Sequence, residues 1–388
     1  MDYYTLSEIV HNYENKKNIS PYFISDWDCN TEEILRPQEI LAQSLKQSIS
    51  HLDTYYFIED DFGKQTIIEY FNSVNIPLNN TSFLIGPNAS LMLTTTFIAL
   101  KEEHIDNILI ILPVYFSIPQ ILRILDINFV KYDTSFPKYT LCFKDIQDKI
   151  EKNSIGAVFI TDPFYGSGVN ISEEFYKELV MYANKHNIYI IVDYARGAMK
   201  WSSTSNNLFD FKLYSILVKT RHYILIDSIS KRIFVNGFKC SLLFSNNEII
   251  KSIRKLGDCF IGSMSAAQLQ FVEHLYNPAN VLEMNKLIEH NINIAKQHFE
   301  IIRSILLGTK IAYTFPTDGN FMLLGIPKEK YNAYKDIEIF QKLLYDFNIY
   351  TLPQSLYTFE DPKYYIFRIN LLLNIEPIVN IIRKLIIW

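Results

Sequence analysis

Residues 188–193 read IYIIVD, the stretch that decides the fold, because it is apolar at consecutive positions and then ends in an acid. A strand that is apolar at every position is typical of a parallel sheet with helices on both faces. Further short apolar runs lie at 82–86 (SFLIG), 107–112 (NILIIL), 127–132 (INFVKY), 156–161 (GAVFIT), 223–227 (YILID) and 239–244 (KCSLLF). Stretches with helical spacing separate several of these runs, at 89–101, 116–125 and 173–185. The pattern predicts an α/β fold with a mostly parallel central sheet covered by helices.

After residue 245 the pattern changes to longer helical stretches with fewer strands between them. Helical spacing covers 247–256, 264–276, 281–306, 335–347 and 376–387, and strand-like runs occupy 321–326 and 364–369. We predict a large domain over residues 46–285 and a smaller α+β domain that joins residues 1–45 to residues 286–388.

The composition excludes several classes of protein. The chain has 388 residues, of which 48% are hydrophobic, so there is ample apolar surface for a folded core. A net charge of −5 gives no support for binding to nucleic acid or to anionic membranes, and the apolar runs are too short to span a bilayer. The four cysteines are scattered, which argues against a disulfide framework or a zinc site and favours a cytoplasmic protein: Cys29, Cys142, Cys240 and Cys259.

Common cofactor motifs are absent from the sequence. No G-x-G-x-x-G follows the early strands, which argues against a dinucleotide site. Gly63-Lys64 lacks the upstream glycine of a P-loop, and the eight histidines show no metal-binding spacing.

Polar residues follow the apolar runs, at the strand ends where ligands bind in open α/β sheets. Asp193 ends IYIIVD, and YILID continues through Ser228 to Lys231 as DSISK. The segments ITDPFYGSGVNIS (160–172) and SFLIGPNAS (82–90) each lead from a strand towards a helix start, and the latter is a natural phosphate site. These strand ends are the predicted location of the chemistry.

In their order and spacing these segments resemble the class I/II aminotransferases, pyridoxal-phosphate enzymes of fold type I. The resemblance runs over roughly residues 50–375, and it includes GSMSAAQ (262–268), Gly319-Asn320-Phe321 and YYIFRINL (364–371). It implies pyridoxal 5'-phosphate as the cofactor of the 46–285 domain and conversion of an L-amino acid to a 2-oxo acid.

The resemblance also implies a role for each residue that matches the family pattern. Lys231 matches the lysine that forms a Schiff base with the cofactor and then moves the α-proton of the substrate. Asp193 matches the acid that keeps the pyridine nitrogen protonated. Tyr115 matches the aromatic that stacks on the ring, and Ser228 matches a phosphate-binding hydroxyl. Arg368 matches the arginine that binds the substrate α-carboxylate through a bidentate fork.

Several positions depart from the family pattern. Tyr165 stands where an Asn is usual, and Arg196 stands where a Tyr is usual, three residues after Asp193. Two expectations stay open for this pair. Either both side chains take over the contacts to the ring oxygen of the cofactor, or Tyr165 fills the turn and Arg196 faces solvent. In the same turn as Tyr165, Asp162-Pro163 replaces the usual Asn-Pro.

The phosphate site departs from the pattern as well. Lys239 replaces an Arg, which keeps the charge and loses the planar fork. In the segment Pro87, Asn88, Ala89, the proline has no N–H to give the phosphate, and Asn88 can compensate. We expect the cofactor to bind more weakly here than in typical members.

The family usually completes its site with residues of a second subunit, so a homodimer is implied. Tyr55 and Tyr56 are the candidates for this contribution. We expect side-chain selectivity to come from the segment around Trp27 and from residues near 354–357, and Asp26 and Asp28 in that first segment can face a cationic substrate.

Two alternatives to transamination stay open on the sequence alone. A lyase or cyclase can use the same carbanion to eliminate or replace a group, or to close a ring, and so make an unusual amino acid. A non-catalytic member that binds the cofactor or a partner is the other alternative, against which the retained Lys231 argues.

Overall fold

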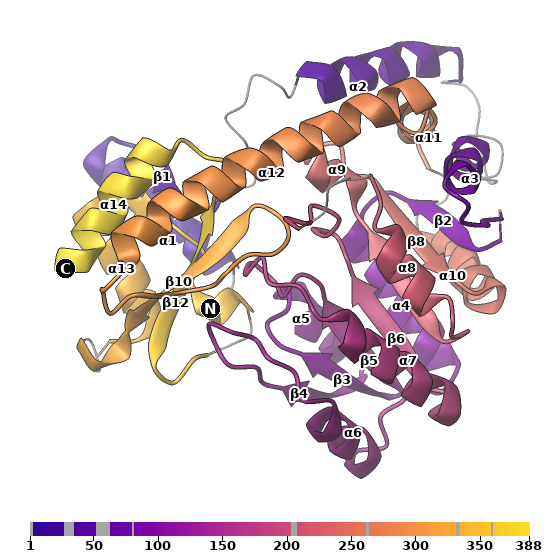
Figure 1. The fold of residues 1–388 in the computed structure, drawn as a ribbon, viewed down its shortest axis with the longest axis horizontal. Coiled ribbons are helices and arrows are strands. Elements are labelled where there is room, and N and C mark those ends of the chain that lie inside the picture. The colour runs from indigo at the N-terminus through magenta and orange to yellow at the C-terminus, as the bar shows by residue number, and fades with distance from the viewer. Residues whose placement is uncertain are drawn as a thin grey trace.

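A seven-stranded sheet forms the centre of the molecule, in the order β2-β8-β7-β6-β5-β3-β4 (Figure 1). The computed structural model describes residues 3–26, 35–51, 63–79, 81–202, 208–260, 264–330, 334–357 and 360–388. The strands are β2 (Phe83–Gly86), β3 (Asn107–Ile111), β4 (Asn128–Tyr132), β5 (Ala157–Thr161), β6 (Tyr189–Asp193), β7 (Tyr223–Asp227) and β8 (Ser241–Ser245). Each of the seven apolar runs forms one of these strands. Only β8 runs against its neighbours, so the predicted mostly parallel sheet is confirmed.

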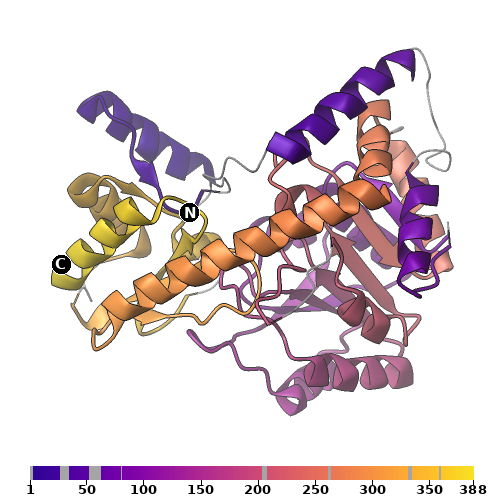
Figure 2. The same cartoon turned by 45° about the horizontal axis from the view of Figure 1, so that its top comes forward.

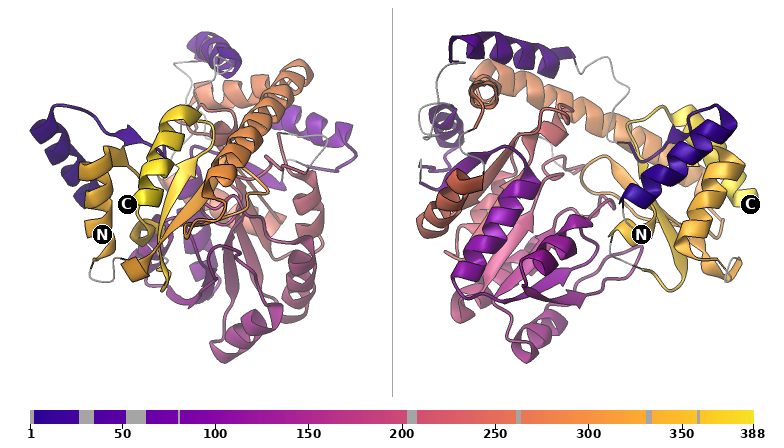
Figure 3. Two further views of the ribbon diagram at one scale, coloured as in Figure 1. Left: turned by 60° about the vertical axis from the view of Figure 1, so that its left-hand side comes forward. Right: turned by 180° about the vertical axis from the view of Figure 1, so that it is seen from behind.

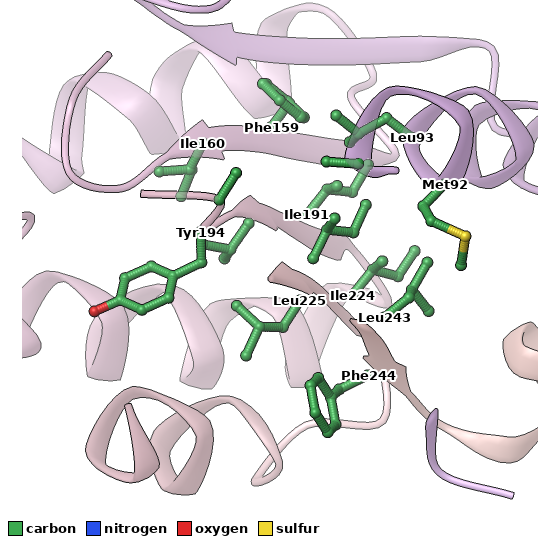
Figure 4. Close-up of a cluster of buried hydrophobic side chains, with 14 of the residues drawn as sticks. Met92, Leu93, Phe159, Ile160, Ile191, Tyr194, Ile224, Leu225, Leu243 and Phe244 are labelled. Carbon is green, nitrogen blue, oxygen red and sulfur yellow. The ribbon is translucent and has the colours of Figure 1, made fainter. Parts of the chain in front are cut away.

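Helices cover both faces of this sheet. On one face α4 packs against α5 and α10, and on the other α7 packs against α6 and α8, as the front and back views show (Figures 1 and 3). The bounds are α4 (Ala89–Glu102), α5 (Ser117–Ile124), α6 (Phe143–Lys152), α7 (Glu173–His186), α8 (Phe211–Leu217), α9 (Ile229–Arg232) and α10 (Asn247–Phe260). The strands are buried at nearly every position, except in the edge strand β4, because both faces of the sheet are covered. Side chains such as Leu93, Ile191 and Phe244 belong to one buried cluster built on this sheet (Figure 4).

A smaller unit is built on an antiparallel sheet of order β12-β10-β9, beside a parallel pair β1-β11. Its strands and helices are α1 (Tyr3–Lys17), β1 (Tyr22–Phe23), β9 (Ala312–Tyr313), β10 (Phe321–Pro327), α13 (Asp336–Phe347), β11 (Ile349–Tyr350), β12 (Tyr364–Asn370) and α14 (Ile375–Ile387). The first strand therefore pairs with a strand more than 300 residues later in the chain, which joins the N-terminal segment to the C-terminal one. Short 3-10 turns complete the chain at Ile49–His51, Lys328–Lys330 and Gln354–Tyr357.

The long helix α12 (Pro278–Leu306) connects the two units, and Figure 2 shows it running from one to the other. Its buried side chains belong to the core of the large unit up to Ile292 and to the core of the small unit from Ala295 onwards. The change of core thus falls a few residues after 285, where the sequence led us to expect the domain boundary.

The helix α2 (Leu35–Ser48) lies against α11 (Ala266–Leu275), on the side of the large unit, with α3 (Lys64–Ser73) also beside α11 (Figure 1). We therefore propose that the N-terminal segment of the small domain ends before α2, rather than at residue 45. None of the helices in the described part of the chain is long and apolar enough to cross a membrane.

Candidate active site

A cavity of about 440 Å³ opens where the parallel strands end, between the two units. Residues that the sequence analysis singled out line it together: Asn88, Ala89, Tyr115, Tyr165, Asp193, Arg196, Ser228, Lys231, Lys239 and Arg368. Pro87 directly precedes the two lining residues at the start of α4. Trp27, Asp28, Tyr55 and Tyr56 lie outside the described residues, so their predicted roles stay predictions.

Lys231 lies in α9, the single helical turn that follows β7. Burial of its amine lowers the pKa of Lys231 to about 8. The charge of Asp193 opposes that shift, whereas the positive charges of Arg196, Arg368 and Lys239 add to it. About a tenth of the amine is therefore neutral at pH 7, far more than for an exposed lysine, and the neutral amine is the form that a nucleophile or general base requires.

Asp193 ends β6, and its carboxylate is nearly inaccessible to solvent. Burial raises its pKa, while the charge of Lys231 and a hydrogen bond from the Ala195 N–H (3.2 Å) favour the ionised form. A buried carboxylate of this kind is suited to hold a proton on a nitrogen base that enters the cavity.

Replacing Arg196 with Gln is expected to raise the pKa of Lys231 above 8, because it removes a positive charge that disfavours the protonated amine. This pKa is measured with an amine-reactive reagent at limiting concentration. The rate at which the reagent modifies Lys231 is followed by mass spectrometry across about pH 6–10. Arg221→Gln, on the exposed surface, is the control and should leave the midpoint in place. An unchanged midpoint in Arg196→Gln would show that the two charges do not interact.

The N-terminus of α4 forms one end of the cavity. Asn88 is its N-cap, and its side-chain oxygen accepts a hydrogen bond from the Leu91 N–H (2.9 Å). The free N–H groups and the dipole of a helix start favour an anion there. The cap contact holds the helix start in place and uses only the oxygen of the Asn88 side chain, so the side-chain Nδ2 and the backbone N–H are the two groups that could donate to a phosphate.

Two further side chains lie at this anion site. Lys239 has a left-handed backbone (φ 53°) and an exposed side chain at the rim of the cavity. The Ser228 hydroxyl donates to the Cys240 carbonyl (3.4 Å), a long bond that an anion could replace.

Two arginines lie on the ring of Phe321 at the other end of the cavity. The guanidinium of Arg368 is 4.2 Å from the ring centroid, and that of Arg196 is 4.9 Å from it. Arg368 extends from β12 and donates to the Ser25 carbonyl (2.8 Å), and Arg196 donates to the Asn320 side chain (3.2 Å). Burial, and then the charge of Arg368, lower the pKa of Arg196. An anionic ligand would offset this concentration of positive charge.

Tyr165 lies between this end of the cavity and the aromatic wall. Its ring is 5.6 Å from that of Tyr115 and 5.9 Å from the guanidinium of Arg368. Burial raises the pKa of the Tyr165 hydroxyl, and the nearby Arg368 and Arg196 lower it in part. Both tyrosines thus belong to the site, and Arg196 lines the cavity rather than the outer surface.

Sequence reasoning missed part of the lining. Asn320 and Phe321 were noticed only as part of a family pattern, and Asp318 was not noticed at all, yet all three line the cavity. Asp318 and Asn320 precede the buried strand β10 of the small unit, and Phe321 begins it. The available signal for these lining residues was therefore a polar segment directly before an apolar run. Leu352 and Leu356 also line the cavity, in the region near 354–357 expected to influence selectivity.

The residues present fit pyridoxal phosphate. The phosphate matches the α4 start with Lys239 and Ser228, the ring matches Tyr115, and the pyridine nitrogen matches Asp193, with the Lys231 amine left for the aldehyde. The cavity volume lies in the range of small-molecule sites. Among the described residues no group of His, Cys, Asp and Glu side chains could hold a metal ion.

Comparison with known proteins identifies the family. The sequence matches the model of the family "Aminotransferase class I and II" over residues 31–385, which is most of the chain. No curated protein sequence matches it.

Several solved structures share the fold. Aspartate aminotransferase from Thermus thermophilus with maleate has a TM-score of 0.80 at 12% identity, with 98% of this chain and 95% of that one covered. YbdL from Escherichia coli, with a methionine aminotransferase function, has a TM-score of 0.77 at 14% identity and coverage of 100% and 96%. An aminotransferase from Staphylococcus aureus has a TM-score of 0.78 at 16% identity and coverage of 95% and 93%.

At these identities the structural likeness establishes fold type I, as the sequence predicted, while the family model establishes the class of enzyme and its cofactor. The protein is a pyridoxal-phosphate-dependent aminotransferase, and the chain belongs to the family of class I and II aminotransferases.

Proposed function

We propose that Lys231 is the catalytic residue of an aminotransferase that converts an L-amino acid to a 2-oxo acid. The observation that carries this proposal is the interaction of the Lys231 amine with the Asp193 carboxylate in a cavity that Arg368 also lines. A base, an acid for the pyridine nitrogen and a carboxylate-binding cation are the groups that transamination needs.

Lys231 would hold pyridoxal phosphate by its amine, and Asp193 would hold a proton on the pyridine nitrogen. Bound pyridoxal phosphate supplies a sink for the electrons left behind when the α-proton of the substrate departs. Tyr115 would keep the ring in place by stacking, and Asn88, Ala89, Ser228 and Lys239 would bind the phosphate, with Pro87 contributing no N–H. The low pKa of Lys231 would let its amine accept the α-proton of the substrate and later donate that proton, without a second base.

Arg368 would bind the substrate α-carboxylate. Its guanidinium is fully buried against Phe321, so its position is defined before the substrate arrives. Tyr165 and Arg196 lie beside it, and we propose that they contact the ring oxygen of the cofactor in place of the usual Asn and Tyr.

We further propose a homodimer in which Tyr55 and Tyr56 of one subunit reach the site of the other, with Trp27 near the substrate side chain. We propose a cytoplasmic location as well, which is supported by the free state of Cys142, Cys240 and Cys259.

The decisive experiment is a single-turnover assay with pyridoxal phosphate, a panel of L-amino acids and no amino acceptor. An aminotransferase is expected to release one 2-oxo acid per subunit and then stop until a 2-oxo acid acceptor is added. Repeated release of product with free ammonia in the absence of acceptor would contradict this function.

Replacing Arg368 with Lys is expected to raise KM for the amino acid by about 10- to 100-fold, because the charge is kept and the bidentate fork is lost. Steady-state kinetics at saturating acceptor measure this change. Arg383→Lys, on the exposed side of α14, is the control. An unchanged KM would place the α-carboxylate elsewhere, with Arg196 the next residue to test.

A further inference from the structure

Three buried carboxylates lie close together beside the cavity, and of the three only Asp318 also lines it. Asp162 follows β5, Asp210 precedes α8, and Asp318 precedes β10, and the side chains of all three are at most 8% exposed. The charged and titratable groups that face them are Lys200, Tyr176 and Tyr194. In the described part of the chain, one lysine therefore faces three acids.

That lysine is engaged by one of the acids. Lys200 Nζ is 2.6 Å from Asp210 Oδ2, which also accepts from the Tyr194 hydroxyl (2.7 Å). The pKa of Asp210 is accordingly lowered by Lys200 and Tyr194, despite the opposing effect of burial. Asp162 and Asp318 are left with neutral donors.

The Asn170 amide joins these two remaining acids. Its Nδ2 donates to Asp162 Oδ1 (3.2 Å) and to Asp318 Oδ2 (3.1 Å), so both carboxyl groups lie within hydrogen-bond distance of one nitrogen. Two ionised carboxylates this close together in a buried site repel each other strongly, and one of them tends to retain its proton.

The hydrogen bonds indicate which oxygen of Asp162 can hold the proton. Asp162 Oδ1 accepts from the Ile171 N–H (3.1 Å) and from Asn170, whereas Oδ2 has the Tyr176 hydroxyl at 3.0 Å, so the proton of that bond can lie on either oxygen. A hydroxyl can accept as well as donate. Burial raises the pKa of Asp318 as well, to about 6, but the hydrogen bond from Asn170 and the charge of Lys200 oppose that shift.

We propose that Asp162 carries a proton on Oδ2 at mildly acidic pH, shared with the Tyr176 hydroxyl, and that this neutral acid is a positioning residue for the segment 317–321. A protonated aspartate resembles an asparagine in shape and in its ability to donate a hydrogen bond. Asparagine is the residue usual at this position in the class I and II aminotransferases. Burial, with a contribution from Asp318, raises the pKa of Asp162 to about 7.

The segment 317–321 connects this cluster to the reaction. The N–H groups of Thr317 and Asp318 donate to the Gly168 carbonyl (2.7 and 2.9 Å), which seats the segment on the turn that carries Asp162. Asn320 and Phe321, which contact Arg196 and Arg368, follow directly. Ionisation of Asp162 would add repulsion to Asp318 and loosen that seat.

The sign of the pH effect follows from the raised pKa. The unfolded chain releases this proton near pH 3.9, whereas the folded chain retains it to about pH 7. The stabilisation is therefore complete below about pH 4 and is lost as pH rises through about 7.

Asp162→Asn tests the proposal, because the amide reproduces the protonated form at every pH. We compare the melting temperature of Asp162→Asn with that of the wild type at each pH. The difference, variant minus wild type, should increase by about 5 °C from about pH 4.5 to about pH 8. The KM of the wild type for its amino acid should rise over the upper part of this range, and that rise should be absent in the variant. The control is Asp148→Asn, an exposed acid paired with Lys144.

Infrared spectroscopy gives a readout that does not depend on activity, so this proposal can fail while the proposed function stands. The wild type should show a protonated carboxyl band at pH 6 that Asp162→Asn lacks. In Asp318→Asn the band should disappear at a lower pH, because the repelling charge is gone. Two results would overturn the proposal. One is a difference in melting temperature between wild type and Asp162→Asn that stays constant across pH, and the other is the absence of the band.

Discussion

Replacing Lys231 with Ala is expected to lower the rate of transamination by at least about 10⁴-fold, because one amine serves both as the nucleophile and as the base that moves the α-proton. Exchange of deuterium from the α-carbon of an α-deuterated amino acid measures the proton transfer separately from binding. The variant should keep its affinity for the substrate carboxylate, since Arg368 is untouched.

Two comparisons make this prediction specific. Lys219→Ala, an exposed lysine, should behave as the wild type. A small primary amine added to Lys231→Ala should restore part of the proton transfer, because it can occupy the space that the side chain leaves. If Lys231→Ala retains more than about a hundredth of the wild-type rate, another group is the base.

Replacing Arg232 with Met is expected to lower the free energy of unfolding by about 3–5 kcal/mol, because it leaves Asp227 as a buried charge without its partner. The side chains of both residues are 0% exposed. Arg232 donates to both oxygens of Asp227, one of them at 2.6 Å, and to the carbonyls of Leu208 and Gly197. This ion pair thus connects β7 and the turn of Lys231 with two neighbouring segments.

Urea unfolding at pH 7 measures the loss. The double variant Asp227→Leu/Arg232→Met should recover much of it, because no charge is then left buried. Arg303→Met, which removes an exposed pair with Glu300, is the control and should unfold as the wild type does. A midpoint for Arg232→Met equal to that of the control would show that the buried pair adds nothing to stability.

Much of the candidate site could be predicted because it lies at strand ends. Asp193 and Lys231 each follow an apolar run, and the carboxyl ends of neighbouring parallel strands meet at one edge of a sheet. Arg368 was identified from a resemblance, since an arginine within an apolar strand has no local signal for what it contacts. The cluster of Asp162, Asp210 and Asp318 escaped the sequence analysis because its members come from three separate loops.

The sequence by itself determined which segments are strands, since a run of apolar side chains reports burial on both faces wherever it lies. It also placed Asp193 and Lys231 at the edge where ligands bind. Only the tertiary structure decided that β8 runs antiparallel to its neighbours, because strand direction depends on the path of the chain between strands, here residues 228–240, which carry Lys231. In the same way, the meeting of Arg196 with Arg368 on Phe321, and of Asp162 with Asp318 through Asn170, depends on contacts between distant segments. Hydrophobic period carries no information about such contacts, because it reports how deeply a residue is buried and not which residue it faces.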